Sequence, residues 1–206
     1  MGRKNKSDIR KPEILQHVYN VLKTEGLQGT TLSKIANLMG VNASLLVYYF
    51  KTKDELMIAL TEDIIDRYLG YFNQQRARIE RIKDTETRLI SILDLLFDPK
   101  WDNAVDANVF YSCFYLSFKN PKIHRLIRDM YIGFKNQMAQ YLKEHYISGH
   151  SIEDESEKTA VAIISLLEGF AYYRAATGDN TSNGVHLAYL KKMAKSMLDI
   201  NASKTA

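Results

Sequence analysis

Apolar residues recur at every third or fourth position along most of the chain, which is the spacing of one face of an α-helix. Ile14, Val18 and Leu22 begin this pattern, and Pro12 suits the first turn of the same helix because its missing N–H costs nothing there. Gly26 is typical of a helix C-terminus. Only three prolines and ten glycines interrupt 206 residues. The pattern therefore predicts an all-α fold.

Capping residues divide the next part of the chain into short helices. Thr30 or Thr31 can cap a second helix, and Asn42 can cap a third. Residues 52–55, with the sequence TKDE, have the form of a capping box that opens a longer fourth helix. Three short helices and the start of a long one thus fit within residues 12–60.

The second and third helices have the spacing of a helix-turn-helix. Ala36 lets the two helices approach, Gly40 takes up a left-handed turn, and Leu46 fills the interface between them. The rest of the chain indicates the helices of a larger bundle, separated by turns that contain Pro, Gly or Asn. Their expected ranges are 84–97, 104–118, 122–147, 156–177 and 185–199.

The net charge of +4 lies entirely at the N-terminal end. Residues 1–60 hold nine Lys or Arg and five Asp or Glu, whereas residues 61–206 hold nineteen of each. A basic segment on a neutral body indicates a head that binds a polyanion, although a flexible basic tail gives the same count. Arg3, Lys4 and Lys6 can follow a nucleic-acid backbone or enter a minor groove, or they can form only a solvated tail.

The remaining composition bounds the chemistry. Cys113 is the one cysteine, so neither an intrachain disulfide nor a cysteine-rich metal site is expected. The N-terminus is polar, and no apolar run approaches the roughly 18 residues of a membrane-spanning helix. The histidines are scattered, and the chain has neither a glycine-rich phosphate loop nor a nucleophile elbow. We therefore expect a cytoplasmic protein that is not an enzyme and has no cofactor, metal or membrane partner.

Residues 29–60, GTTLSKIANLMGVNASLLVYYFKTKDELMIAL, resemble the N-terminal domain of the TetR family of bacterial transcription regulators. The likeness covers residues 12–60 and rests on Thr-Thr, Ile-Ala, Gly-Val, Tyr-Tyr-Phe and Lys-x-Lys-x-Glu-Leu. Where the family has two aromatic residues and a histidine before the phenylalanine, this chain has Val47, Tyr48 and Tyr49. A weaker likeness, in LLEGFAYYRAATGD and around Trp101, is to the choline-responsive branch of the family.

The resemblance implies a DNA-binding head and a larger body that binds a small effector and dimerises through its last two helices. We therefore expect a basic arm at 1–11, a helix-turn-helix domain at 12–55, and an effector-binding and dimerisation domain at 56–206. The expected function is that of a sequence-specific repressor that a small molecule releases from a palindromic operator. The alternative is a helical module that binds a protein or an anionic surface without reading DNA sequence.

On DNA, the third helix is expected to lie in the major groove, which is just wide enough for one helix. Tyr48 and Tyr49 can each direct a hydroxyl to a phosphate, although Tyr49 can equally be core. Asn42 can contact a base edge or only cap its helix. Lys53 is an unexpected cation in a first helical turn unless a phosphate also sits there. The expected DNA-binding residues are Thr31, Ser33, Asn42, Ala43, Ser44, Val47, Tyr48, Tyr49 and Lys53.

The middle of the chain carries aromatic residues at helical spacing. Phe110, Phe114 and Phe118 align on one stripe, with two tyrosines beside it. Such a stripe is more often core than ligand site, yet tyrosine hydroxyls need partners and a pocket in a helical body supplies them. Our hypothesis is a cationic or aromatic effector with Glu168 as a counter-charge. The expected pocket residues are Trp101, Phe110, Tyr111, Phe114, Tyr115, Tyr131, Phe134, Glu168 and Tyr172.

Two segments near the C-terminus indicate a dimer interface. Within residues 157–177, the run AVAIISLLEGFAYYRAA is apolar nearly all round, which favours burial on more than one side. A second apolar stripe, with lysines turned away from it, consists of Leu190, Met193, Ala194 and Met197. Two such helices from each subunit can form a four-helix interface, or they can pack inside one chain.

Overall fold

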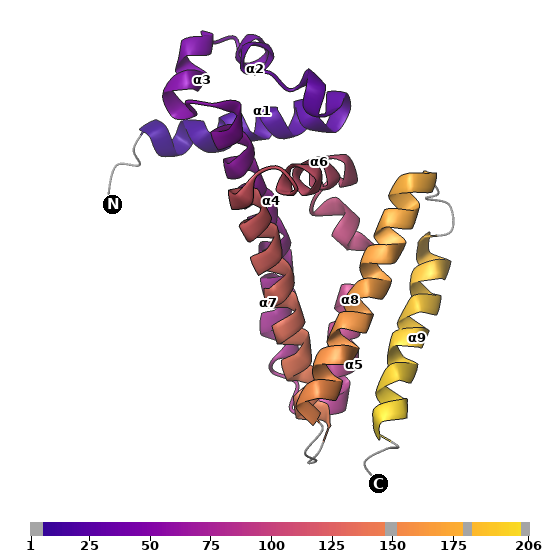
Figure 1. Ribbon diagram of the computed structural model, residues 1–206. Helices are drawn as coiled ribbons and strands as arrows, with labels where there is room; N and C mark the ends of the chain where they lie inside the picture. Colours follow the sequence, from indigo (N-terminus) through magenta and orange to yellow (C-terminus); the bar gives the residue numbers. More distant parts are fainter. Residues whose placement is uncertain (1–5, 147–151, 179–182, 203–206) are drawn as a thin grey trace. The chain divides into compact units, whose positions relative to one another are not determined.

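The computed structural model describes residues 6–146, 152–178 and 183–202, and Figure 1 shows their helices. Within these ranges the chain forms α-helices and one 3-10 helix, η1, without any strand, which confirms the all-α prediction. The elements are α1 (Lys6–Gly29), α2 (Leu32–Leu38), α3 (Ala43–Tyr49), α4 (Lys53–Ile79), α5 (Thr85–Leu96), η1 (Pro99–Asn103), α6 (Ala107–Ser117), α7 (Pro121–His145), α8 (Ile152–Thr177) and α9 (Asn183–Ala202).

The chain packs as two compact units, each built from two stretches of sequence. Unit 1 comprises residues 1–68 and 105–128, and unit 2 comprises residues 69–104 and 129–206. Helix α6 belongs with the N-terminal helices because it packs on α1. The predicted boundary at residue 55 separates the DNA-binding domain from the effector-binding domain. The two packing units do not test this difference in function, so the boundary stays a prediction.

Helix α1 starts earlier than the sequence indicates. We expected residues 1–11 to form an arm and the helix to begin at Pro12, but α1 begins at Lys6. Pro12 lies inside α1, where it has no N–H to donate to the carbonyl four residues earlier, so here proline does not mark the start of the helix. Arg3 and Lys4 of the predicted arm lie outside the described residues, as does the side chain of Lys6.

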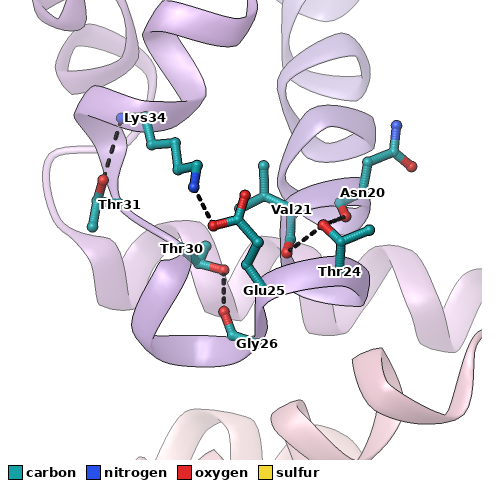
Figure 2. Close-up of polar contacts among 8 residues, drawn as sticks. All are labelled: Asn20, Val21, Thr24, Glu25, Gly26, Thr30, Thr31 and Lys34. Atoms are coloured by element: carbon teal, nitrogen blue, oxygen red, sulfur yellow. Dashed lines mark hydrogen bonds and ion pairs between the residues drawn. The ribbon is translucent and has the colours of Figure 1, made fainter.

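Gly26 bends α1 near its end. Its φ of +67° and ψ of −171° define a backbone conformation that is essentially restricted to glycine. The Thr30 hydroxyl donates a hydrogen bond to the Gly26 carbonyl at 2.8 Å, as Figure 2 shows. The chain therefore makes one more turn, to Gly29, after the predicted stop.

The α2–α3 turn is built as the helix-turn-helix spacing predicts. Ala36 and Leu46 are buried, and Gly40 has a φ of +64°. The Gly40 N–H donates to the Asn37 carbonyl at 3.1 Å, and the Val41 N–H donates to the Ala36 carbonyl at 3.0 Å. This pair of bonds satisfies carbonyls that the end of α2 would otherwise leave without partners. The turn is thus fixed by local hydrogen bonds and by one left-handed glycine.

Unit 2 has its own apolar core, to which α5, α7, α8 and α9 contribute. The predicted dimer stripe on α9 is partly wrong, because Ala194 is fully buried in this core and Leu190 and Met197 pack against it. Met193 alone of that stripe is exposed. The intrachain alternative therefore holds for this face of α9. Among the described residues, no helix is both long enough and apolar enough to cross a bilayer.

Candidate functional site

Helix α3 has one buried and one exposed side. Leu46 is fully buried, whereas Tyr48 is 77% exposed and Val47 is 46% exposed. Tyr49 is partly buried, and its ring meets the Tyr48 ring edge to face with centroids 5.2 Å apart. The exposed predicted contacts are Thr31, Ser33, Asn42, Ser44, Val47, Tyr48 and Lys53, and the partly buried ones are Ala43 and Tyr49. An exposed tyrosine on a short helix is thus available to a flat, polar partner.

Two of the predicted contacts also cap their own helices. The Asn42 side-chain oxygen accepts a hydrogen bond from the Ser44 N–H at 3.0 Å. The Thr31 hydroxyl oxygen accepts one from the Lys34 N–H at 3.2 Å. Both groups therefore satisfy N–H donors at a helix start. Capping uses only the side-chain oxygen of Asn42, so its amide nitrogen keeps two N–H donors for another partner.

Lys53 binds backbone in this structure. Its ammonium donates a hydrogen bond to the Leu27 carbonyl at 2.8 Å, so it ties the end of α1 to the start of α4. The side chain is exposed, and an ammonium group has three donors. The contact spans 26 residues of sequence, so the pattern around Lys53 could not reveal it. One lysine can therefore both position the head and meet a phosphate.

Polar contacts fix the connection between α1 and α2, as Figure 2 shows. Lys34 forms an ion pair with Glu25 across this connection. Thr24 donates its hydroxyl to the Asn20 carbonyl at 3.1 Å. The Thr24, Thr30 and Thr31 bonds are local to one end of α1 or α2, whereas the Lys34–Glu25 pair joins the start of α2 to the end of α1. The local sequence pattern predicts the Thr31 cap but not the ion pair.

A second polar cluster joins three helices of unit 1. The Tyr19 hydroxyl accepts a hydrogen bond from the Asp106 N–H at 2.7 Å, and the Arg67 guanidinium lies 4.6 Å from the centre of the Tyr19 ring. Lys23 pairs with the Asp106 carboxylate at 3.2 Å. Asp106 also caps α6, because its side chain accepts from the Asn108 N–H at 3.0 Å. The local sequence pattern did not reveal this cluster, because its members are distant in sequence.

The nine residues predicted for an effector pocket fall into two groups. Trp101, Tyr131, Phe134, Glu168 and Tyr172 belong to unit 2, and Phe110, Tyr111, Phe114 and Tyr115 belong to unit 1. In unit 1 the Phe110 and Phe114 rings are stacked with centroids 6.3 Å apart. The Phe114 ring also meets that of Phe118 edge to face at 5.3 Å, so the three phenylalanines lie in one row as predicted.

In unit 2, aromatic residues of α4 join the predicted group. The Trp101 ring lies 4.8 Å from that of Tyr71 and 6.4 Å from that of Phe72. Phe72 also meets Phe134 edge to face at 6.1 Å. Tyr71 and Phe72 were not among the predicted residues, although both continue the helical spacing of α4 beyond Ile65. They make the ring cluster around Trp101 larger than expected.

Glu168 of α8 lies partly buried in unit 2. Burial raises the pKa of its carboxyl, and a hydrogen bond from Tyr131 opposes that rise. A carboxylate in such surroundings is poorly solvated and would gain from a cationic partner. Tyr172, by contrast, is 66% exposed.

Cys113 is a core residue and shows no sign of reactivity. It is fully buried in α6, and burial raises the pKa of its thiol to about 11. At neutral pH the thiol is protonated, which makes it a poor nucleophile. In the part of the chain that the structure describes, no cluster of three His, Cys, Asp or Glu side chains is arranged to hold a metal ion.

Two profiles of known protein families match this chain. Residues 14–60 match the profile described as bacterial regulatory proteins, tetR family. Residues 84–200, more than half of the chain, match the profile described as tetracyclin repressor-like, C-terminal domain.

Individual proteins are similar over most of their length. The HTH-type transcriptional regulator BetI of Proteus mirabilis (strain HI4320) is 24% identical over 193 residues, which span 93% of this chain and 91% of that protein. The nucleoid occlusion factor SlmA of Vibrio vulnificus (strain YJ016) is 26% identical over 167 residues, 80% of this chain and 83% of that protein. A transcriptional regulator from Saccharomonospora viridis, solved in complex with choline, has a TM-score of 0.72 at 18% identity and covers 94% of this chain and 97% of its own. The last likeness shows a shared fold.

Proposed function

The chain belongs to the TetR family of bacterial transcription regulators and is a DNA-binding regulator, and we propose that it represses transcription from a palindromic operator until a small cation releases it. The observation that carries the DNA-binding surface is the exposed side of α3. There Tyr48 is 77% exposed although an aromatic ring gains by burial. A ring and hydroxyl placed against a sugar and phosphate would bury this surface and use its polar end. A cytoplasmic location accords with this role.

The proposed interface comprises the exposed side of α3, the start of α2 and Lys53. Val47 offers methyl groups to thymine, and Asn42 offers an amide donor to a base edge. Because few of these side chains make directional bonds to bases, we propose that DNA shape supplies part of the specificity.

The test is binding of the purified protein to its own upstream DNA and to random duplex across a salt series. We expect a preference of about 10³ or more for the upstream DNA. Tyr48→Ala is expected to weaken binding by about 1–3 kcal/mol. The matched control is Phe118→Ala, which removes a ring that is 73% exposed on a different element. Equal binding to both DNAs, together with binding to anionic vesicles, would instead support an anionic-surface module.

The contact of Lys53 with the Leu27 carbonyl and its proposed contact with phosphate need to be distinguished by experiment. Lys53→Ala removes the bond to the Leu27 carbonyl as well as any phosphate contact. Measuring thermal stability beside DNA affinity distinguishes them. A phosphate contact predicts that the slope of log affinity against log salt falls by about one unit. A purely structural role predicts a lower melting temperature with an unchanged slope.

For the effector we propose a small organic cation bound in unit 2 near Glu168. Its support is the partly buried carboxyl, which accepts a hydrogen bond from Tyr131, and the rings that gather around Trp101 in the same unit, since such rings attract cations. The similar regulator from Saccharomonospora viridis was solved with choline. Choline is therefore the first probe, and its uncharged analogue 3,3-dimethylbutanol is the control.

Calorimetry is expected to show tighter binding of choline than of the alcohol. Glu168→Gln keeps the shape of the side chain and removes its charge, so it should reduce this preference by about tenfold or more. The Glu62→Gln variant changes an exposed glutamate of α4 and serves as its control. Equal binding of the two probes to the unmodified protein would contradict a cationic effector.

A further inference from the structure

A separate cavity, largely open to solvent, lies in unit 1 between the C-terminal part of α1 and α6. Its volume is about 400 Å³, and all of its lining residues belong to unit 1. Leu22, Lys23 and Leu27 line it from α1, and Tyr111, Ser112 and Tyr115 line it from α6. This volume falls in the range of roughly 300–1,000 Å³ that is usual for small-molecule sites. Tyr111 and Tyr115 thus line a cavity in unit 1 that is distinct from the cation site proposed in unit 2.

Positive charge predominates at this cavity. Lys23 is the one charged residue among those that line it, and its side chain remains 53% exposed. Lys53 donates to the carbonyl of Leu27 in the cavity wall. Lys119 lies 5.0 Å from the centre of the Tyr115 ring. The neighbouring carboxylates are those of Asp106, 3.2 Å from Lys23, and of Glu25, which adjoins the lining residues Thr24 and Gly26 and pairs with a fourth lysine, Lys34. The electrostatics therefore favour an anion.

The other side chains that line the cavity favour a ligand with an aromatic ring. The Tyr111 and Tyr115 side chains, one helical turn apart, present aromatic surface, and Leu22 and Leu27 present aliphatic surface opposite. Tyr115 remains 50% exposed, so ring area is available for contact. Asn108 and Ser112 add an amide and a hydroxyl for hydrogen bonds.

We propose that this cavity binds a small aromatic carboxylate, with its ring against Tyr111 and Tyr115 and its carboxylate on the ammonium of Lys23. The ligand competes with Asp106 for Lys23. Asp106 also caps α6 and donates its N–H to the Tyr19 hydroxyl of α1 at 2.7 Å. Occupation therefore loosens contacts that hold α1 on α6 and changes the DNA affinity of the head. This last effect rests on the proposed function, whereas the binding itself does not.

The first experiment measures binding to the full-length protein without DNA. The probes are benzoate, phenylacetate, salicylate and 1-naphthoate, and each is compared with its uncharged amide by calorimetry. We expect at least one carboxylate to bind in the micromolar to millimolar range, about tenfold or more tighter than its amide, as a charge-assisted hydrogen bond implies. If none of the four carboxylates binds better than its amide, the proposal is overturned.

Variants then locate the site. Lys23→Met is expected to lose the carboxylate preference, and Lys23→Arg to retain it. Lys122→Met, an exposed lysine in the first turn of α7, is the matched control and should bind like the unmodified protein. Ser112→Leu places an aliphatic side chain in the cavity and should weaken both carboxylate and amide. Circular dichroism checks that each variant is folded. Unchanged binding to folded Lys23→Met and Ser112→Leu would refute this site.

A second measurement separates this site from the proposed function. The bound carboxylate is added to the complex with upstream DNA, and we expect the DNA affinity to fall by about fivefold or more, the size of a typical coupling between sites. Carboxylate binding without such a fall would overturn the coupling and leave the binding site established. Failure of the protein to prefer its upstream DNA would count against the proposed function, not against the cavity.

Discussion

Substitution of Gly40 measures how much the left-handed backbone conformation of one residue matters to the stability of the helix-turn-helix. Its φ is +64°, and a Cβ added there would meet no atom within 4 Å. The cost of Gly40→Ala therefore arises from the left-handed backbone alone, and we expect a loss of about 1–2 kcal/mol in the free energy of unfolding. Urea denaturation measures it. Gly70→Ala is the control: Gly70 lies within α4, also with open space around it. There alanine should stabilise the protein by about 0.5–1 kcal/mol.

Glu168 makes a pH-dependent contribution to stability. Because burial raises the pKa of its carboxyl above 4.5, the folded protein binds the proton more tightly than the unfolded chain does. This stabilisation is complete below pH 4.5 and is lost as the pH rises through the folded-state pKa. Glu168→Gln should therefore be more stable than the unmodified protein at neutral pH. Denaturation curves across this pH window measure the difference, and a variant that is less stable at neutral pH would contradict the sign.

Individual residues were predictable where their partners are close in sequence. Thr31 and Asn42 cap helices through N–H groups two or three residues away, so the local pattern revealed them. The contact between Lys53 and Leu27 depends on how α4 meets the end of α1. Tyr49 is partly buried because of its neighbours in three dimensions, and spacing alone left that open. Contacts distant in sequence were therefore beyond a reading of local pattern.

At the scale of one element, the start of α3 separates folding from recognition. Asn42→Asp keeps an oxygen acceptor for the Ser44 N–H and places a negative charge at a helix N-terminus, which is favourable. Thermal stability should therefore be retained, whereas DNA affinity should fall because the charge faces phosphates. Asn42→Ala should lose about 1 kcal/mol of stability instead. Melting curves and DNA titrations of both variants test this, and full DNA affinity of Asn42→Asp would place residue 42 away from the interface.

Helix positions followed from the sequence because apolar spacing and caps are local properties. The 3-10 helix η1 was not expected. It contains Trp101, whose indole N–H donates a hydrogen bond to the Leu95 carbonyl at 2.6 Å. The start of α1 and the buried face of α9 were predicted wrongly. An amphipathic pattern shows that a helix has an apolar face, but α9 carries apolar residues on two faces. Which of the two enters the intrachain core depends on α5 and α8 beside it.

For the whole molecule, the exposed face of the last two helices is the main feature that remains to be explained. Helices α8 and α9 pack side by side in unit 2 (Figure 1). Among the side chains that the structure describes on these helices, six large apolar or aromatic ones are exposed: Val161, Tyr172 and Tyr173 on α8, and Val185, Tyr189 and Met193 on α9. The α9 residues are four positions apart and share one stripe. We propose that a second copy of the chain covers this face, because a symmetric pair of such faces would bury it.

Tyr189→Asp tests this dimer. Tyr189 is 65% exposed, so the substitution should leave the fold of a single chain intact, whereas in the dimer it would bury an unpaired charge. We expect dimerisation to weaken by about a hundredfold, and sedimentation velocity measures it. The operator affinity should fall in parallel, since two linked heads bind two half-sites more tightly than one head does. Tyr48→Asp, on the still more exposed tyrosine of α3, should lose DNA binding and remain dimeric. If Tyr189→Asp is still a dimer, the two copies meet elsewhere, and the exposed face of α8 and α9 needs a different partner.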